Sequence, residues 1–177
     1  MNLKNKKCFI LIGNDRTGKT TFQKHLIRKI ALADYGKRLD CNLDFSILNP
    51  DMQKRYESIF FINRSYQEKK EEYKSVHEYF EKYFKDTDIC VLSSHLVVAD
   101  VAEMINEAKA RFYNVAGVFF SNSIEAEKNL NSEISKLDWD KRIVLENPLV
   151  ESGGEDEISW QIEKMAEYFT NYLLKQD

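Results

Sequence analysis

The sequence lacks the features that would set it apart from ordinary globular proteins. Two prolines and six glycines are spread over 177 residues, and no repeat, linker or low-complexity segment divides it. The cysteines Cys8, Cys41 and Cys90 show no paired spacing, which favours buried thiols in a reducing cytoplasm over a disulfide framework. No apolar run reaches the roughly 18 residues of a membrane span. The apolar run behind the basic N-terminus is too short for a signal peptide, so we expect a soluble, cytoplasmic protein.

A surplus of positive charge is missing as well. The chain has 26 basic and 29 acidic residues and a formal net charge of −3. This balance argues against general nucleic-acid binding, although a local basic groove stays open. Hydrophobic residues make up 43% and charged residues 31%, which is typical of globular rather than disordered chains. We expect a single domain over residues 1–177, without membrane association.

Short apolar segments alternate along the chain with segments in which apolar residues recur at helical spacing. The first kind predicts buried strands, at 8–12, 45–48, 89–92, 115–120 and 143–145. The second kind predicts helices that begin near Lys19 and at Asn122, that span 66–86 and 97–112, and that follow Gly153-Gly154. Strands that alternate with helices imply right-handed crossovers and a parallel sheet covered on both faces.

The segment Gly13-Asn-Asp-Arg-Thr-Gly-Lys-Thr20 fits the phosphate-binding pattern G-x-x-x-x-G-K-[ST]. Its glycines let successive backbone N–H groups turn inward toward phosphate oxygens, and the following helix adds its positive N-terminal end. Lys19 is then expected to reach the β- and γ-phosphates, and the Thr20 hydroxyl to ligate Mg²⁺. We therefore predict that ATP binds with magnesium, through Gly13, Asn14, Asp15, Arg16, Thr17, Gly18, Lys19, Thr20 and Thr21.

A second carboxylate for magnesium is missing where such sites usually have one. The strand at 89–92 runs into Ser93-Ser94-His95, while Asp88 lies at its opposite end and Asp100 is too far along. Ser93 is assigned as a second, weaker magnesium contact; otherwise another acid serves or the chemistry is impaired. His95 is interpreted as a capping or packing residue, the more frequent role of a lone histidine after a strand, with a catalytic base as the alternative.

The segment Ile10-Leu-Ile-Gly-Asn-Asp-Arg-Thr-Gly-Lys-Thr-Thr21 resembles the thymidylate kinase family, within the nucleoside monophosphate kinase class of P-loop folds. The resemblance implies that Asp15 contacts the sugar 3′-hydroxyl of the acceptor monophosphate. It also implies that Arg16 braces the transferring phosphoryl group, which makes Arg16 and Lys19 the expected catalytic residues. A GTPase is set aside because the only D-x-x-G string, residues 15–18, lies inside the phosphate loop.

A second segment, Ile59-Phe-Phe-Ile-Asn-Arg64, is similar to the Phe-x-x-Asn-Arg segment of the same family. This resemblance implies that Phe60 stacks on a thymine ring and that Arg64 hydrogen-bonds a base edge. The chain departs from the family at Ser93-Ser94-His95, which replaces an Asp-Arg-[Tyr/Ser] sequence. An arginine is also missing around Leu48-Asn49, where Arg55 is the nearest substitute.

Together these features predict an α/β fold, namely a three-layer P-loop NTPase fold with a five-stranded, mostly parallel sheet. The expected activity moves the γ-phosphate of MgATP to a (deoxy)nucleoside monophosphate, a pyrimidine such as dTMP. One alternative is another acceptor, such as a polynucleotide end or sugar nucleotide, because 91–96 and 108–115 resemble zeta-toxin and polynucleotide-kinase-like proteins. The other is an ATP-binding protein without transferase activity. The expected partner is a small nucleotide, and a homodimer stays open.

Overall fold

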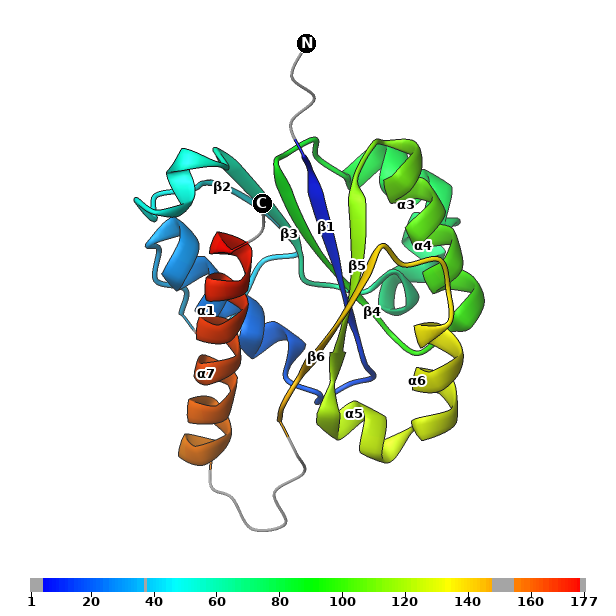
Figure 1. Cartoon of the computed structure of the whole chain (residues 1–177). Coiled ribbons are helices and arrows are strands. Elements are labelled where there is room, and N and C mark those ends of the chain that lie inside the picture. Colours follow the sequence, from blue (N-terminus) through cyan, green and yellow to red (C-terminus); the bar gives the residue numbers. More distant parts are fainter. Residues whose placement is uncertain (1–4, 37, 148–154, 176–177) are drawn as a thin grey trace.

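The computed structural model describes residues 5–36, 38–147 and 155–175, which form an α/β fold around one six-stranded sheet (Figure 1). The strands lie in the order β2-β3-β4-β1-β5-β6, and all neighbours are parallel except the antiparallel pair β2 and β3. The mostly parallel α/β sheet is confirmed, but the prediction of five strands was wrong. The strands are β1 (Lys7–Ile12), β2 (Asn42–Ser46), β3 (Ser58–Ile62), β4 (Ile89–Ser94), β5 (Asn114–Phe120) and β6 (Lys141–Leu145).

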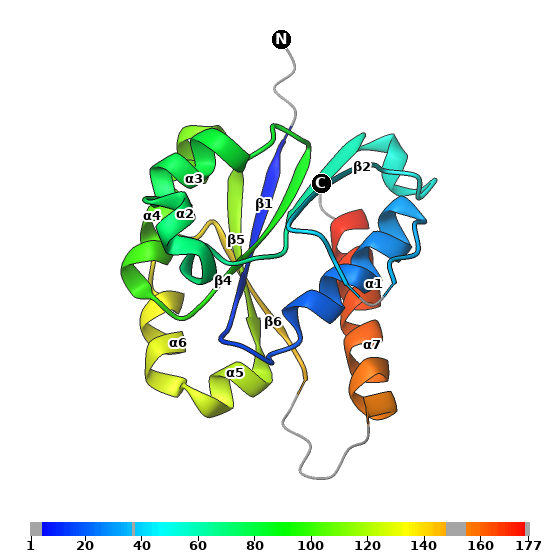
Figure 2. The same cartoon turned by 180° about the vertical axis from the view of Figure 1, so that it is seen from behind.

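Helices cover both faces of this sheet (Figure 2). One face carries α1 (Lys19–Ala31) and α7 (Glu155–Leu174), and the other carries α3 (Val76–Tyr83), α4 (Val98–Ala110) and α6 (Lys128–Ser135). No helix within the described residues has both the length and the apolar character needed to cross a membrane. The remaining short elements are η1 (Met52–Lys54), η2 (Tyr66–Lys69), α2 (Lys70–Tyr73) and α5 (Ser121–Ala126).

Aromatic side chains fill the layer between the sheet and the helices α1 and α7. Phe22 of α1 packs edge-on against Phe120 and Phe169, with ring centroids 5.8 and 5.5 Å apart. Phe9 of β1 meets the same Phe169 at 4.7 Å. Each fully buried phenylalanine stabilises the fold by about 1.5–3 kcal/mol. This packing holds α1, and therefore the loop that precedes it, firmly on the sheet.

The predicted strand at 45–48 is instead one arm of a hairpin. β2 ends at Ser46, and the chain returns antiparallel as β3 with Phe45 paired to Ile59. The four residues Ile59 to Ile62 are all fully buried. A continuous apolar run of this kind is typical of a strand covered on both faces, so the interpretation of 59–64 as a ligand-binding segment was wrong for its apolar part.

The predicted helix over 66–86 is interrupted. Lys74 adopts a left-handed backbone with φ 64°, which ends α2, and Ser75 caps α3 by accepting a hydrogen bond from the Glu78 N–H at 3.1 Å. The helix expected at Asn122 begins at Ser121 without a side-chain cap. The predicted helix start at 153–154 lies outside the described residues. The other predicted strands are confirmed to within two residues at each end, the helix predicted over 97–112 is α4, and the helix predicted to begin near Lys19 is α1.

The site region lies where the chain changes faces. After β1 the chain passes to α1 on one face of the sheet, whereas after the adjacent β4 it passes to α4 on the other face. Such a switch leaves a crevice outside the carboxyl ends of the two strands, where ligands of open α/β sheets bind. The predicted phosphate loop and Ser93-Ser94-His95 follow these two strand ends.

Candidate functional site

The loop between β1 and α1 is tied to the segment that follows β4. The Gly13 N–H donates to the Ser94 carbonyl oxygen at 3.1 Å. Farther along the loop, the Asn14 side-chain oxygen accepts a hydrogen bond from the Leu96 N–H at 3.2 Å. These two bonds place the expected ATP-binding residues next to the end of β4, as the switch in chain direction requires.

Both motif glycines are needed for local packing. A Cβ added at Gly13 would lie 2.7 Å from Oγ1 of Thr17, inside the same loop. Gly18 has φ 96°, in the left-handed region that favours glycine, and its added Cβ would lie 2.9 Å from Cδ1 of Ile162 on α7. Arg16 also has a positive φ of 63° and is exposed. A non-glycine residue in this region stores on the order of 1–3 kcal/mol of strain, which is characteristic of functional loops.

The Lys19 side chain turns back into the loop. Its Nζ donates to the Asn14 carbonyl oxygen at 2.8 Å and also to the Gly13 carbonyl oxygen. Lys19 is buried, and burial lowers its pKa to about 8, while the Asp15 and Glu68 carboxylates act in the opposite direction. At neutral pH the loop therefore holds a largely protonated amine.

Helix α1 begins at this amine without a cap. Gly18 precedes the first turn, no side chain accepts a hydrogen bond from its N–H groups, and the turn contains no acidic residue. The first N–H groups of a helix need external acceptors, and the helix dipole adds positive potential there. An uncapped start of a 13-residue helix beside a buried lysine can bind an anion such as phosphate.

A cavity of about 320 Å³ opens above the loop. Four cationic and two anionic side chains line it, so its lining carries net positive charge. Thr20 reaches across it, and its hydroxyl donates to the Asn63 side-chain oxygen at 2.9 Å. The lining residues are Asp15, Arg16, Thr17, Gly18, Lys19, Thr20, Thr21, Arg38, Leu39, Asn63, Arg64, Glu68 and His95.

Phe60 does not lie in this cavity, which corrects the predicted base-stacking role. Its side chain is fully buried under the α3 side of the sheet and contacts Phe84 edge-on, with ring centroids 6.3 Å apart. A ring enclosed on both sides has no free face for a nucleotide base. Arg64, by contrast, lines the cavity and donates to Glu68 at 3.0 Å, a contact that raises the pKa of Arg64.

Ser93 is also misplaced for its predicted role as a magnesium contact. It is fully buried on the α1 side of β4, and its Oγ accepts a hydrogen bond from Gln23 Nε2 at 3.0 Å. Successive residues of a strand face opposite sides, so Ser94 points to the other face, where it contacts Gln67. Neither serine lines the cavity, and we withdraw Ser93 as a metal ligand.

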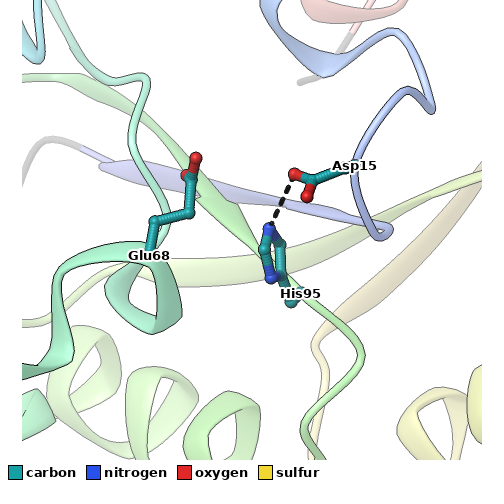
Figure 3. A group of neighbouring side chains, drawn as sticks. All are labelled: Asp15, Glu68 and His95. Atoms are coloured by element: carbon teal, nitrogen blue, oxygen red, sulfur yellow. Dashed lines mark ion pairs between the residues drawn. The ribbon is translucent and has the colours of Figure 1, made fainter.

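His95 was interpreted from the sequence as a capping or packing residue, with a catalytic base as the alternative, and it was not among the predicted site residues. It lines the cavity, and its Nε2 lies 3.4 Å from Oδ1 of Asp15 (Figure 3). Glu68 completes a group whose ligand atoms all lie within 4.8 Å of one another. The sequence signal was its position directly after a strand, whereas the pairing of that strand with β1 is seen only in the structure.

Glu68 differs from the other two members of this group because its carboxylate is already used. One oxygen accepts from Arg64 at 3.0 Å, and the other accepts from the Ser65 N–H at 2.8 Å and from its hydroxyl at 3.0 Å. These bonds cap the short helix η2 and lower the pKa of Glu68 against the opposing effect of burial. The three residues are therefore not a free set of metal ligands.

Gln67 fixes η2 against the end of β4. Its side-chain oxygen accepts from the His95 N–H at 3.1 Å, and its amide nitrogen donates to Asp100 at 3.1 Å and to Ser94 at 3.2 Å. Both the oxygen and the nitrogen of the Gln67 side-chain amide thus form hydrogen bonds with residues outside η2. The backbone of His95 is thereby held, which leaves its imidazole directed at the cavity.

No model of a known protein family matches this chain, and no curated protein is similar to it in sequence.

Proposed function

We propose that the loop from Gly13 to Thr20 binds the triphosphate of ATP and that the chain is an ATP-dependent phosphotransferase. The observation that supports this most directly is the buried Lys19 amine, held inside a loop that leads straight into the uncapped start of α1. Amine charge and helix N–H groups together favour phosphate oxygens. The packing of Gly13 and Gly18 adds support, because a side chain at either position would collide with its surroundings.

Magnesium fits this site as an ion that arrives with the nucleotide. Thr20 is exposed toward the cavity and already directs its hydroxyl at the Asn63 oxygen. Thr20 would hold the ion, which when bound would offset negative charge on the phosphates. Mg²⁺ usually keeps several waters and takes few protein ligands, so the site can work without a carboxylate at the end of β4.

The acceptor side of the proposed site is polar. Besides the loop residues Asp15 and Arg16, the cavity is lined by Arg38 and Arg64 from outside the loop. The aromatic ring expected to read a base, Phe60, is buried elsewhere. We therefore propose transfer of the γ-phosphoryl group without a preference for thymine, and the pyrimidine specificity implied by the resemblance is not carried forward.

A coupled ADP-release assay tests this proposal against a panel of acceptors. The panel contains nucleoside monophosphates, nucleosides, sugar nucleotides and an oligonucleotide with a 5′-hydroxyl. Acceptor-dependent ADP release that disappears in Lys19→Ala, but persists in Lys24→Ala on the same helix, supports the proposal. Binding of ATP without release of ADP under any condition would leave a nucleotide-binding protein without transferase activity.

A further inference from the structure

Asp15 and His95 come from two different loops and meet over the cavity. Asp15 belongs to the loop after β1, and His95 follows β4, the strand that pairs with β1 in parallel. The carboxylate is 80% exposed and the imidazole 20% exposed, with Oδ1 and Nε2 3.4 Å apart (Figure 3). The cavity thus has an acid–base pair at the rim of the proposed phosphate site.

The His95 imidazole has few polar partners within the described part of the chain. Among residues 5–36, 38–147 and 155–175, Asp15 is the only side chain that pairs with it, and its fixed backbone N–H is bonded separately to Gln67. Glu68, the third nearby group, is committed to Arg64 and Ser65. Helix α4 has no side-chain cap, so the histidine does not cap it, and the imidazole lines the cavity, where a bound molecule can contact it.

Resting on the proposed function, we infer that Asp15 and His95 form a general-base pair and that the acceptor is a hydroxyl group rather than a phosphate. The acceptor O–H bond breaks and its proton passes to His95 Nδ1, the ring nitrogen that does not face Asp15, while Nε2–H stays directed at the Asp15 carboxylate. The electron pair left on the acceptor oxygen forms a bond to the γ-phosphorus of ATP. The bond from that phosphorus to the β,γ-bridging oxygen breaks, which releases ADP. Asp15 stabilises the imidazolium that forms.

Phosphate acceptors and hydroxyl acceptors differ in whether they need a general base. A phosphate monoester loses its second proton with a pKa of about 6, so it arrives ionised at neutral pH and needs no base. A hydroxyl resembles water, with a pKa far above neutral pH, so it keeps its proton until the reaction and gains from a positioned base. A doubly charged phosphate that approached His95 would also have to approach the exposed Asp15 carboxylate, 3.4 Å from the imidazole.

Hydrolysis of MgATP tests the pair directly, because water is the smallest hydroxyl acceptor. We expect His95→Ala to lower the turnover number for hydrolysis on the order of 10²-fold, with the Michaelis constant for ATP unchanged within about twofold. Added imidazole should restore part of the turnover in His95→Ala, but not in His95→Gln, whose side chain still occupies the space. Asp15→Asn, like His95→Ala, should lower the turnover number for hydrolysis.

His77→Ala is the matched control, since His77 lies on the surface of α3 and pairs with Glu107 outside the cavity. It should keep wild-type turnover and respond to imidazole no more than the wild type does. The inference is overturned if His95→Ala hydrolyses ATP at the wild-type rate, or if imidazole restores nothing while thermal melting shows an intact fold. It is also overturned if the wild type binds ATP yet does not hydrolyse it, whereas absence of ATP binding would contradict the proposed function itself.

Discussion

The side-chain amide of Asn147, beyond the end of β6, donates a hydrogen bond to the carbonyl oxygen of Thr17 at 3.1 Å. Asn147 is buried, and its backbone N–H donates to the Ser121 hydroxyl at 2.7 Å. The loop proposed to bind phosphate is thus supported from behind by residues at the ends of β5 and β6. Its shape depends on the other half of the sheet as well as on its own glycines.

Asn147→Ala should therefore destabilise the protein. The Thr17 carbonyl would lose its shorter side-chain hydrogen bond and keep only the longer one from Asn122 at 3.4 Å, and loss of one such bond costs about 0.5–1.5 kcal/mol in the free energy of unfolding. Urea unfolding measures this change. Asn129→Ala, an exposed position on α6, is the control and should stay within about 0.5 kcal/mol of wild type. Equal stability of the two variants would show that this amide does not support the loop.

The sequence predicted what depends on neighbours in the chain. The spacing of Gly13, Gly18 and Lys19 is local, and a loop between β1 and α1 and a helix start at Lys19 are both present. The role of Phe60 could not be decided, because an apolar run reads equally well as a ligand-binding segment and as a buried strand. The approach of His95 to Asp15 depends on β1 and β4 being neighbours, which no local pattern encodes.

Phe60→Ala should act on stability and leave nucleotide binding alone. Truncation of a fully buried phenylalanine costs about 3–5 kcal/mol, because burial is lost and a cavity remains. Chemical unfolding gives the magnitude, and the control is Phe112→Ala, whose side chain is 83% exposed. A Phe60→Ala protein that is stable but binds acceptor more weakly would restore the base-stacking role.

Arg16→Ala should lower turnover far more than it weakens ATP binding. Positive charge that meets the γ-phosphoryl group mainly in the transition state raises kcat without tightening the ground state. By analogy with other transition-state arginines, a loss on the order of 10³-fold is expected. Steady-state kinetics separate the two effects, with Arg28→Ala on the exposed side of α1 as the control. A rise in KM at constant kcat would make Arg16 a binding residue only.

Affinity for ATP should fall as the pH rises through about 8. Burial lowers the pKa of Lys19 to about 8, so above this pH the amine of the free protein loses the charge that attracts phosphate. Below it, the charge is present and affinity is highest, although bound phosphate will move the transition upward. Titrations between pH 7 and 9 measure the slope. Lys19→Met should bind weakly and without this dependence, and a similar slope in that variant would assign it to another group.

The central claim is that the Lys19 amine and the start of α1 bind the triphosphate of ATP. Isothermal titration of the protein with a non-hydrolysable ATP analogue and magnesium measures this affinity directly. Lys19→Ala and Lys24→Ala are compared with the wild type, on the condition that the proteins have equal thermal stability. We predict saturable binding to the wild type and to Lys24→Ala, and a loss of at least about tenfold in affinity, roughly 1.4 kcal/mol, for Lys19→Ala. Equal affinity in Lys19→Ala, or no binding by the wild type, would contradict it.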